Sequence, residues 1–256
     1  MTLFREQLDE MSDESFQSLA GMLKKRMDPA LIRFGAERIA DFFAHVGSAS
    51  RPVTDAGGQP LRWQDRLIME KIEAGSAVLD LGCGQGGLLK RLMTEKGVKG
   101  QGIELEPAAV LECVRQGVAV LQDDIYDGLA QFPDNSYDCV ILEETLQTLD
   151  RPDKVMTDML RVGRQGFISF PNFAFWQVRL DLAVRGRMPR TGWLPYNWYD
   201  TPNIHNLSIQ DFILWAEEEK INIVEGYVLI EGEVRELRIS DNLYAEEAML
   251  IVEKNR

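Results

Sequence analysis

Residues 78–86, VLDLGCGQG, combine an apolar run, one aspartate and closely spaced glycines. Glycine adopts positive φ readily and has no Cβ, so a ligand can approach the backbone of such a turn closely. The free N–H groups at the start of the helix that follows point towards such a ligand. The segment therefore predicts a strand, a glycine turn and a helix that together bind a nucleotide-type cofactor.

Asp80 decides between two cofactor classes that use this layout. Gly82, Gly84 and Gly87 satisfy the GxGxxG spacing of dinucleotide binders, but that spacing alone is a weak signal. A carboxylate at the tip of the first strand would repel a pyrophosphate, whereas it suits the amino group of a methionine moiety, directly or through water. We therefore expect S-adenosylmethionine rather than NAD, with a turn that binds no ligand as the alternative.

Two further carboxylates fall at the ends of later predicted strands. Glu104 comes eighteen residues after Gly86 and can accept both hydroxyls of a cofactor ribose. Asp124 can bond an adenine amino group, with Ile125 packing on the ring, and Asp123 competes for the same role. Ligands of open parallel sheets bind at the carboxyl ends of the strands, which is where all these residues are expected.

The residues that would act on a methyl acceptor are less distinct. Methyl transfer from a sulfonium needs an aligned nucleophile and exclusion of water, so a general base is not obligatory. Glu143 and Glu144 can serve as a base, bind a cationic acceptor, or simply begin a helix. His205 is either a base or a structural histidine. The catalytic residues stay unassigned, and no metal site is predicted.

The segment from Pro171 to Pro202 gathers aromatic and basic residues over an unusually long connection. Such a segment can cover the cofactor, accept an anionic substrate, or form a protein contact, where tryptophan, tyrosine and arginine are enriched. Its aromatics can also simply fill the core. Because long connections inside compact domains are usually functional, we favour a lid or an interface.

Hydrophobic periodicity places these motifs on alternating strands and helices, which implies a parallel sheet with right-handed crossovers. The last two strands lie close together in sequence and predict an antiparallel pair at one edge. Residues 1–60 are expected to form a helical extension and linker, and residues 61–256 the cofactor domain. The predicted strands are Ala77–Leu81, Gly102–Leu105, Val118–Gln122, Tyr137–Leu142, Phe167–Phe170, Val224–Ile230 and Ala248–Val252.

Composition narrows the classes of partner. With 28 Lys and Arg against 41 Asp and Glu, the formal net charge of −13 disfavours nucleic acid as a partner. The three cysteines show no disulfide framework and indicate reduced thiols, and no apolar run is long enough for a membrane span. We expect a cytoplasmic protein without membrane contact, whose N-terminal helices can pack on their own domain or form a homo-oligomer.

The glycine segment and Glu104 resemble the class I S-adenosylmethionine-dependent methyltransferases, and a narrower resemblance covers about residues 61–256. The strings VLDLGCG, GQGIELEP, LAQFPDNSYDCVIL, RGRMPRT, LPYNWYDTPNIH and SIQDF are similar in order and spacing to the MetW family of methionine biosynthesis proteins. The resemblance implies an α/β, Rossmann-like class I methyltransferase fold: a seven-stranded, mostly parallel sheet with an antiparallel C-terminal strand, plus the N-terminal helical extension.

The resemblance also implies binding of S-adenosylmethionine and pairing with a homoserine O-acyltransferase, whose activity the family supports. A small-molecule methyltransferase is the alternative function. Gln85 and Gly87 stand where the family pattern has acidic residues, and the pair Glu143 and Glu144 replaces a more neutral pair. The predicted cofactor-binding residues are Asp80, Gly82, Cys83, Gly84, Gly86, Glu104, Leu105, Asp124, Ile125 and Glu143.

Overall fold

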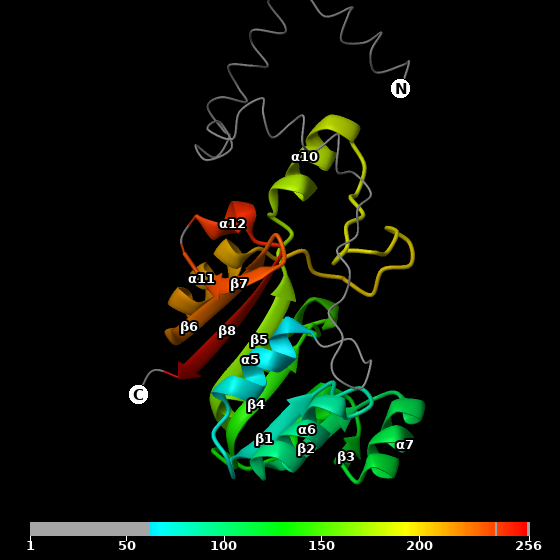
Figure 1. Cartoon of the computed structure of the whole chain (residues 1–256), viewed down its shortest axis with the longest axis vertical. Coiled ribbons are helices and arrows are strands. Elements are labelled where there is room, and N and C mark those ends of the chain that lie inside the picture. The colour runs from blue at the N-terminus through cyan, green and yellow to red at the C-terminus, as the bar shows by residue number, and fades with distance from the viewer. Residues whose placement is uncertain (1–61, 239, 255–256) are drawn as a thin grey trace, which may run out of the picture. The chain divides into compact units, whose positions relative to one another are not determined.

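The computed structural model describes residues 62–238 and 240–254, which fold into a single sheet flanked by helices (Figure 1). The predicted N-terminal helices and linker, residues 1–60, lie outside the described residues. The sheet has eight strands in the order β3-β2-β1-β4-β5-β8-β6-β7. They are β1 (Ala77–Leu81), β2 (Lys99–Glu104), β3 (Ala119–Gln122), β4 (Tyr137–Glu143), β5 (Gly163–Pro171), β6 (Ile221–Ile230), β7 (Glu233–Glu236) and β8 (Glu247–Lys254).

The first five strands form the parallel part of the sheet. β1 pairs with β2 on one side and with β4 on the other, β3 extends the β2 side, and β5 extends the β4 side. β8 then runs antiparallel to both β5 and β6. This arrangement confirms the predicted α/β class and the antiparallel C-terminal strand, and the short β7 adds an eighth strand at the edge beside β6.

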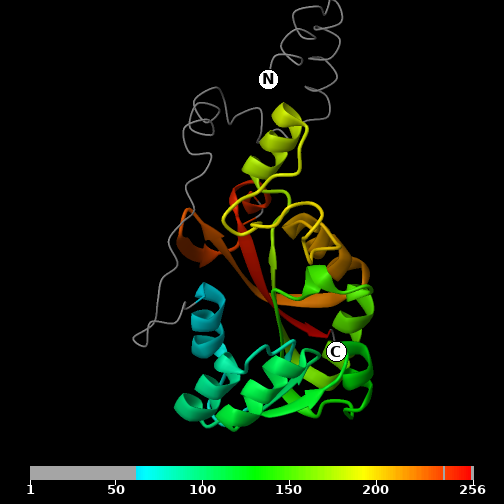
Figure 2. The same cartoon turned by 90° about the vertical axis from the view of Figure 1, so that its right-hand side faces the viewer.

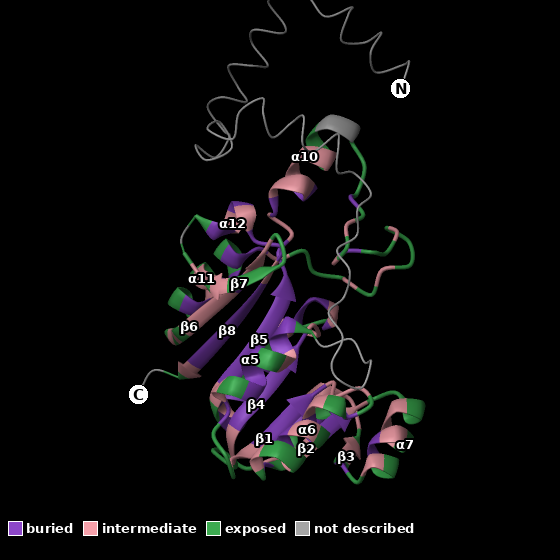
Figure 3. Cartoon of the chain, viewed as in Figure 1, coloured by how far each residue is buried: buried purple, intermediate pink, exposed green. Residues whose placement is uncertain are grey.

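Helices cover both faces of the sheet because successive strand residues point to opposite sides. Val78 packs with the layer of α5 (Trp63–Lys71), α6 (Gly87–Lys96) and α7 (Pro107–Gln116). The next residue, Leu79, packs with the layer of α8 (Ile125–Ala130), α9 (Pro152–Val162) and α11 (Ile209–Glu218). Figure 2 shows α5 and α11 on opposite sides of the sheet, and Figure 3 shows the buried central strands between these layers.

The connections that leave the carboxyl ends of the parallel strands are less regular than the sheet itself. Between β4 and α9 lies the short 3-10 helix η1 (Leu146–Thr148), and α12 (Asp241–Tyr244) precedes β8. The long segment after β5 includes α10 (Trp176–Arg185), so it is only partly irregular. In the described residues, no helix is both long and apolar enough to span a bilayer.

The order in which strands are added to the sheet changes side between β1 and β4. From β1 it adds β2 and β3 on one side, and it then returns to place β4 and β5 on the other. In open parallel sheets this reversal point leaves a crevice beyond the carboxyl ends of the strands, where ligands bind. Asp80 is paired with Gly102 of β2 and with Ile141 of β4, so it lies at that point.

Candidate functional site

The glycine turn, residues 82–86, joins β1 to α6 and depends on three positive backbone angles. Gly82, Gly84 and Gly86 have φ values of 74°, 55° and 80°, which L side chains rarely adopt. A Cβ added at Gly84 would meet no atom within 4 Å, so this turn leaves open space beside its backbone. The turn therefore has the positive φ angles that the sequence predicted, and its backbone at Gly84 borders open space.

Glu104, at the end of β2, is tied to the glycine turn. Its Oε2 accepts a hydrogen bond of 2.8 Å from the Gly84 amide, and its Oε1 accepts one of 2.9 Å from the Glu106 amide. A carboxylate has about four lone-pair positions, so both oxygens keep further acceptor capacity. The neighbouring Leu105 is 64% exposed, which leaves an apolar side chain beside this carboxylate.

Asp123 and Asp124 differ in how fully their oxygens are engaged. Asp124 is the N-cap of α8, and its Oδ1 accepts a hydrogen bond of 2.8 Å from the Tyr126 amide. Asp123 accepts from the Asp124 amide through Oδ1 and from Gln131 Nε2 through Oδ2. Ile125 lies half-buried at the first turn of the same helix. Capping of α8 therefore accounts for one oxygen of Asp124, and both oxygens of Asp123 have partners.

Four carboxylates come together where β1 and β4 end and β8 begins, and we call them the acidic cluster: Asp80, Glu143, Glu144 and Glu247. Arg62, at the start of α5, bonds Glu143 Oε2 at 2.9 Å. Gln64 donates to Glu144 Oε1 at 3.3 Å and to Glu247 Oε2 at 3.0 Å. One guanidinium and one amide thus link carboxylates from strands that are far apart in sequence.

Backbone geometry contributes to the placement of Glu144. Its φ of 51° is unusual for a residue with a side chain, and such conformations persist where the surrounding structure enforces them. The Glu144 amide donates to the backbone oxygen of Ser169 at 3.2 Å and to its Oγ at 3.1 Å. The chain therefore turns sharply at the end of β4, and the turn is anchored on β5.

Burial sets the electrostatics of the acidic cluster because desolvation penalises the charged form of a carboxyl group. Burial raises the pKa of Asp80 to about 7 and the pKa of Glu144 to about 8. It also raises the pKa of Glu143 and the pKa of Glu247, and Arg62 counteracts part of each of these shifts. These carboxyls therefore exchange protons closer to neutral pH than ordinary surface carboxylates do.

Sequence reasoning missed Arg62, Gln64 and Glu247 as members of this site. Arg62 is the N-cap residue of α5 and Gln64 lies in its first turn, and neither position carries a motif of its own. Glu247 pairs with Pro171 across the antiparallel β5–β8 ladder, which brings the start of β8 to the carboxyl edge of the parallel strands. The strand order is needed to place Glu247 at this edge. The local sequence signal is weaker: polar residues directly before an apolar strand indicate the end of that strand, but not which edge of the sheet it reaches.

The structure does not join His205 to the acidic cluster. The His205 side chain is exposed, and its Nε2 lies 3.3 Å from the backbone oxygen of Asp150. Its backbone N–H donates to Gln147, in η1, at 3.0 Å. These contacts fasten the segment to η1, so the structural interpretation of this histidine accounts for its surroundings.

Two free cysteines, Cys83 and Cys113, lie close together beside the glycine turn. Cys83, in the glycine turn, has its sulfur 3.8 Å from that of Cys113 in α7. Burial raises the pKa of Cys83 and the pKa of Cys113, so both favour the thiol form. Within the described residues, no group of three or more His, Cys, Asp or Glu is arranged to hold a metal ion.

The aromatic residues of the segment after β5 divide into two sets. Phe175, Val178 and Leu194 form a small buried core, with the Trp193 ring 5.1 Å from that of Phe175. Trp198 and Tyr199, by contrast, are 77% and 70% exposed. The segment thus both fills a small core and presents aromatic side chains on the surface, and its role as a lid or an interface stays a prediction.

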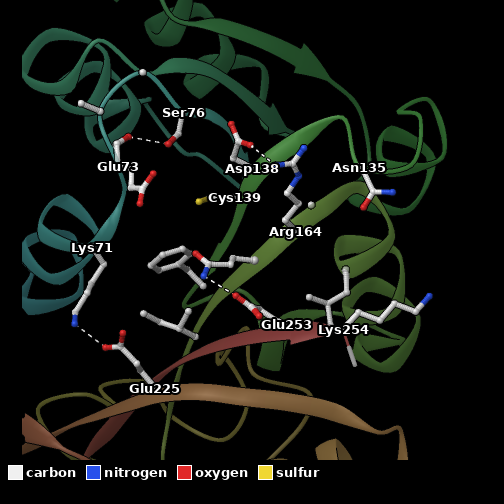
Figure 4. Close-up of a pocket in the computed structure, with 17 residues that line it drawn as sticks. Lys71, Glu73, Ser76, Asn135, Asp138, Cys139, Arg164, Glu225, Glu253 and Lys254 are labelled. Carbon is white, nitrogen blue, oxygen red and sulfur yellow. Dashed lines mark hydrogen bonds and ion pairs between the residues drawn. The ribbon is translucent and has the colours of Figure 1, made fainter. Parts of the chain in front are cut away.

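A separate cavity of about 770 Å³ opens at the amino end of the parallel strands (Figure 4). Ser76, before β1, and Asp138, near the start of β4, mark this end of the sheet. The ion pairs around it are Lys71 with Glu225 at 2.6 Å and Arg164 with Asp138 at 3.6 Å. It lies at the opposite end of β1 from the glycine turn and belongs to a different part of the molecule from the predicted site.

Comparison with protein families matches residues 62–252 to the model for the methionine biosynthesis protein MetW. The bifunctional methionine biosynthesis protein MetXA/MetW of Rhodopirellula baltica is 38% identical over 160 residues, which is 59% of this chain and 26% of that protein. Norajmaline N-methyltransferase of Rauvolfia serpentina is 31% identical over 97 residues, 35% of this chain and 32% of that protein. The chain thus spans between a quarter and a third of these relatives' length.

Solved structures share the fold at low sequence identity. A SAM-dependent methyltransferase from Archaeoglobus fulgidus is 15% identical with a TM-score of 0.54, covering 74% of this chain and 90% of that one. The cyclase SpnF is 14% identical with a TM-score of 0.54, covering 84% of this chain and 91% of its own. At these identities the likeness concerns the arrangement of strands and helices.

Proposed function

Because the chain belongs to the family of the methionine biosynthesis protein MetW, we propose that it binds S-adenosylmethionine and acts as an accessory partner of a homoserine O-acyltransferase. The observation that carries the partnership is the relative from Rhodopirellula baltica, whose name joins MetXA and MetW in one chain. Proteins that are fused in one organism are often associated as separate chains in another. We take the MetXA part to correspond to the acyltransferase.

The site residues fit this cofactor. The open side of Gly84 provides the cradle that a nucleoside needs, and Glu104 stands beside it with acceptor capacity for ribose hydroxyls. Asp80 is a buried acceptor for the methionine amino group, and Asp124 is an acceptor for the adenine amino group. We extend the assignment to Gly82, Cys83, Gly86, Leu105, Ile125 and Glu143, which surround these positions.

When bound, S-adenosylmethionine supplies an electrophilic methyl group on a sulfonium. The chain's own contribution is to hold the adenosine at the ends of β2 and β3 and the methionine portion at the ends of β1 and β4. Leu105 and Ile125 offer apolar contact to the adenine ring. The proposal for an accessory role requires this binding but requires no proton transfer by the protein.

The exposed aromatic surface, which we define as Tyr196, Trp198 and Tyr199, supports a protein partner. Exposed fractions of 48% to 77% leave these large rings accessible in the described structure. Tyrosine and tryptophan are enriched at the centres of protein interfaces, where burial of one ring contributes strongly to affinity. We therefore assign this surface to the contact with the acyltransferase.

Co-purification with the acyltransferase from the same cell tests the partnership. We expect the two chains to elute together and the acyltransferase rate to rise when this chain is added. Trp198→Ala should weaken the complex at least about tenfold, because truncation of a central interface aromatic commonly costs 2 kcal/mol or more.

Leu214→Ala is the matched control, since Leu214 is 47% exposed but lies on α11, outside the aromatic surface. It should leave the complex unchanged. If neither co-elution nor a change in acyltransferase rate is seen with the unaltered chain, the accessory role is wrong. If the complex forms but Trp198→Ala weakens it no more than Leu214→Ala does, the aromatic surface is not the contact.

A methyltransferase that acts on a small molecule is the second candidate. The relative named as an N-methyltransferase and the acidic cluster beside the predicted methionine position favour it. A carboxyl group whose pKa lies near neutral, such as that of Glu144 at about 8, is suited to general acid–base work. Incubation of the chain with labelled S-adenosylmethionine and amine metabolites tests this candidate, and absence of label transfer at saturating cofactor would contradict it.

A further inference from the structure

The acidic cluster, when ionised, carries more negative charge than its cationic partner neutralises. Arg62 bonds Glu143 at 2.9 Å and also reaches Asp65 at 3.5 Å. The other side-chain partners of Glu144 and Glu247 are the neutral groups of Trp63, Gln64 and Ser169. In the part of the chain that the structure describes, Arg62 is the only positive charge paired with a member of the cluster.

One oxygen of the cluster has no hydrogen-bond partner within residues 62–238 and 240–254. The Glu143 side chain is only 6% exposed, and its Oε1 is buried without a donor among the described residues. Buried carboxylate oxygens are normally satisfied, because leaving one without a partner forfeits its hydration. This orphaned oxygen, in a cluster with excess negative charge, marks a place where a positively charged group of a ligand would be stabilised.

The cluster lies on the side of the crevice where the proposed cofactor carries its positive charge. Glu104, the proposed ribose acceptor, is at the end of β2, and Asp80 and Glu143 are at the ends of β1 and β4. A ligand whose ribose lies at β2 must extend its remaining portion across β1 towards β4. In S-adenosylmethionine that portion contains the sulfonium.

We infer that the acidic cluster makes this site selective for the sulfonium cation, so that it binds S-adenosylmethionine in preference to S-adenosylhomocysteine. The inference rests on the proposed function, since it assumes that the cofactor occupies the crevice. If so, the fraction of sites that are filled depends on the concentration of S-adenosylmethionine more than on that of S-adenosylhomocysteine. A chain with this property can signal the level of the methylated cofactor to a partner enzyme.

Comparison of S-adenosylmethionine with S-adenosylhomocysteine isolates the effect of the positive charge on binding. They share the adenosine, the amino group and the carboxylate, and they differ by one methyl group and one positive charge. Opposite charges several ångströms apart attract much more strongly at the effective dielectric of a partly buried site, of order 20, than they do in water. We therefore expect a preference for S-adenosylmethionine of at least about tenfold.

The preference should grow as the cluster ionises. The pKa of Asp80, about 7, and the pKa of Glu144, about 8, place the loss of these protons between mildly acidic and mildly alkaline pH. The partly buried thiol of the neighbouring Cys83 has a raised pKa and stays neutral over this range. The other charged or titratable groups that act on the two carboxyls are Arg62, Asp65, Glu104, Glu143 and Glu247.

Calorimetric titration of the full chain with each ligand, at about pH 6 and about pH 9, tests the inference. We expect the ratio of the two affinities to favour S-adenosylmethionine and to rise with pH. Glu143→Gln, which keeps the shape of the side chain and removes its charge, should lower the ratio several-fold. Glu247→Gln should also lower the ratio of the two affinities. It provides a second test in case Glu143→Gln fails to fold.

Glu95→Gln is the control, since Glu95 is an exposed residue of α6 paired with Arg91, and it should leave the ratio unchanged. The affinity for S-adenosylhomocysteine verifies that each variant is folded. Equal affinities for the two ligands at both pH values, or a ratio that Glu143→Gln and Glu247→Gln do not change, overturn the inference while the proposed cofactor site stands. If neither ligand binds the unaltered chain, the proposed cofactor site itself is wrong, and the inference is overturned with it.

Discussion

At the scale of single residues, the proposed role of the glycine turn in ligand binding can be tested by one substitution. A side chain at Gly84 would project into the open space beside the turn, where the proposed cofactor lies. Gly84→Arg should therefore abolish binding of S-adenosylmethionine, measured by calorimetry. The positive φ of 55° adds backbone strain to this variant, so a control with the same strain is needed.

Gly97→Arg is that control. Gly97 has a φ of 66° and no atom within 4 Å of its added Cβ, but it closes the far end of α6. It should reproduce any loss of stability without the loss of binding. Retained affinity in the Gly84 variant would mean that the cofactor does not lie against this turn.

The residues of the site show how far sequence reasoning reaches. Asp80, Glu104 and Asp124 were placed correctly at strand ends because each follows an apolar run and precedes a helix. The partnership of Glu143 with Arg62 was not foreseen, because the two are 81 positions apart and meet only through the tertiary fold. Local patterns predict which residues lie at the edge of the sheet, whereas the strand order decides which of them touch.

At the scale of elements, α11 is fixed by a reciprocal capping box. Ser208 Oγ accepts a hydrogen bond from the Asp211 amide at 3.1 Å, and Asp211 Oδ2 accepts one from the Ser208 amide at 2.8 Å. Ser208→Ala should lower the free energy of unfolding by about 1 kcal/mol, because the amide at the third helical position loses its acceptor. Urea denaturation measures this change.

Ser240→Ala provides the comparison. Ser240 occupies the N-cap position of α12, but its side chain makes no capping hydrogen bond there. Its replacement should change the unfolding free energy by much less. Equal effects at both serines would show that capping does not determine the stability of α11.

The sequence predicts the strand boundaries correctly where a strand ends with its apolar residues. It misses them where polar residues extend the strand by pairing with a neighbouring strand. β2 begins at Lys99, earlier than expected, because its first residues, Lys99 and Gly100, pair with Ala77 and Val78 of β1. β5 extends over polar residues in the same way, with Gln165 bonding Glu253 of β8 at 2.7 Å. β7 consists of four residues with polar neighbours and gives no hydrophobic signal of its own.

At the scale of the whole molecule, the buried carboxyls make stability depend on pH. Burial raises the pKa of Asp80 to about 7, whereas an unfolded aspartate has a pKa of about 3.9. The folded state therefore holds this proton more tightly, and the associated stability is present below about pH 4 and is lost as the pH rises through about 7. The raised pKa of Glu144 and the raised pKa of Glu246 act with the same sign.

Asp80→Asn should consequently unfold at a higher temperature than the unaltered chain at about pH 8, and this advantage should shrink towards about pH 4. Thermal melts across this range measure the difference. The exposed Asp127, on α8, supplies the control substitution Asp127→Asn, which should show no such trend. A destabilisation of the Asp80 variant that is the same at every pH would contradict burial of its charge.

The position of β8 has a consequence for how the chain acquires its fold. β8 lies between β5 and β6, although β6 precedes it in the sequence. As the nascent chain lengthens, β1 to β5 can assemble while one edge of β5 remains open, and the β6–β7 hairpin has no strand to join. An unpaired, apolar strand edge promotes association between chains. Until β8 emerges from the ribosome, the open edge of β5 thus exposes this protein to misassembly.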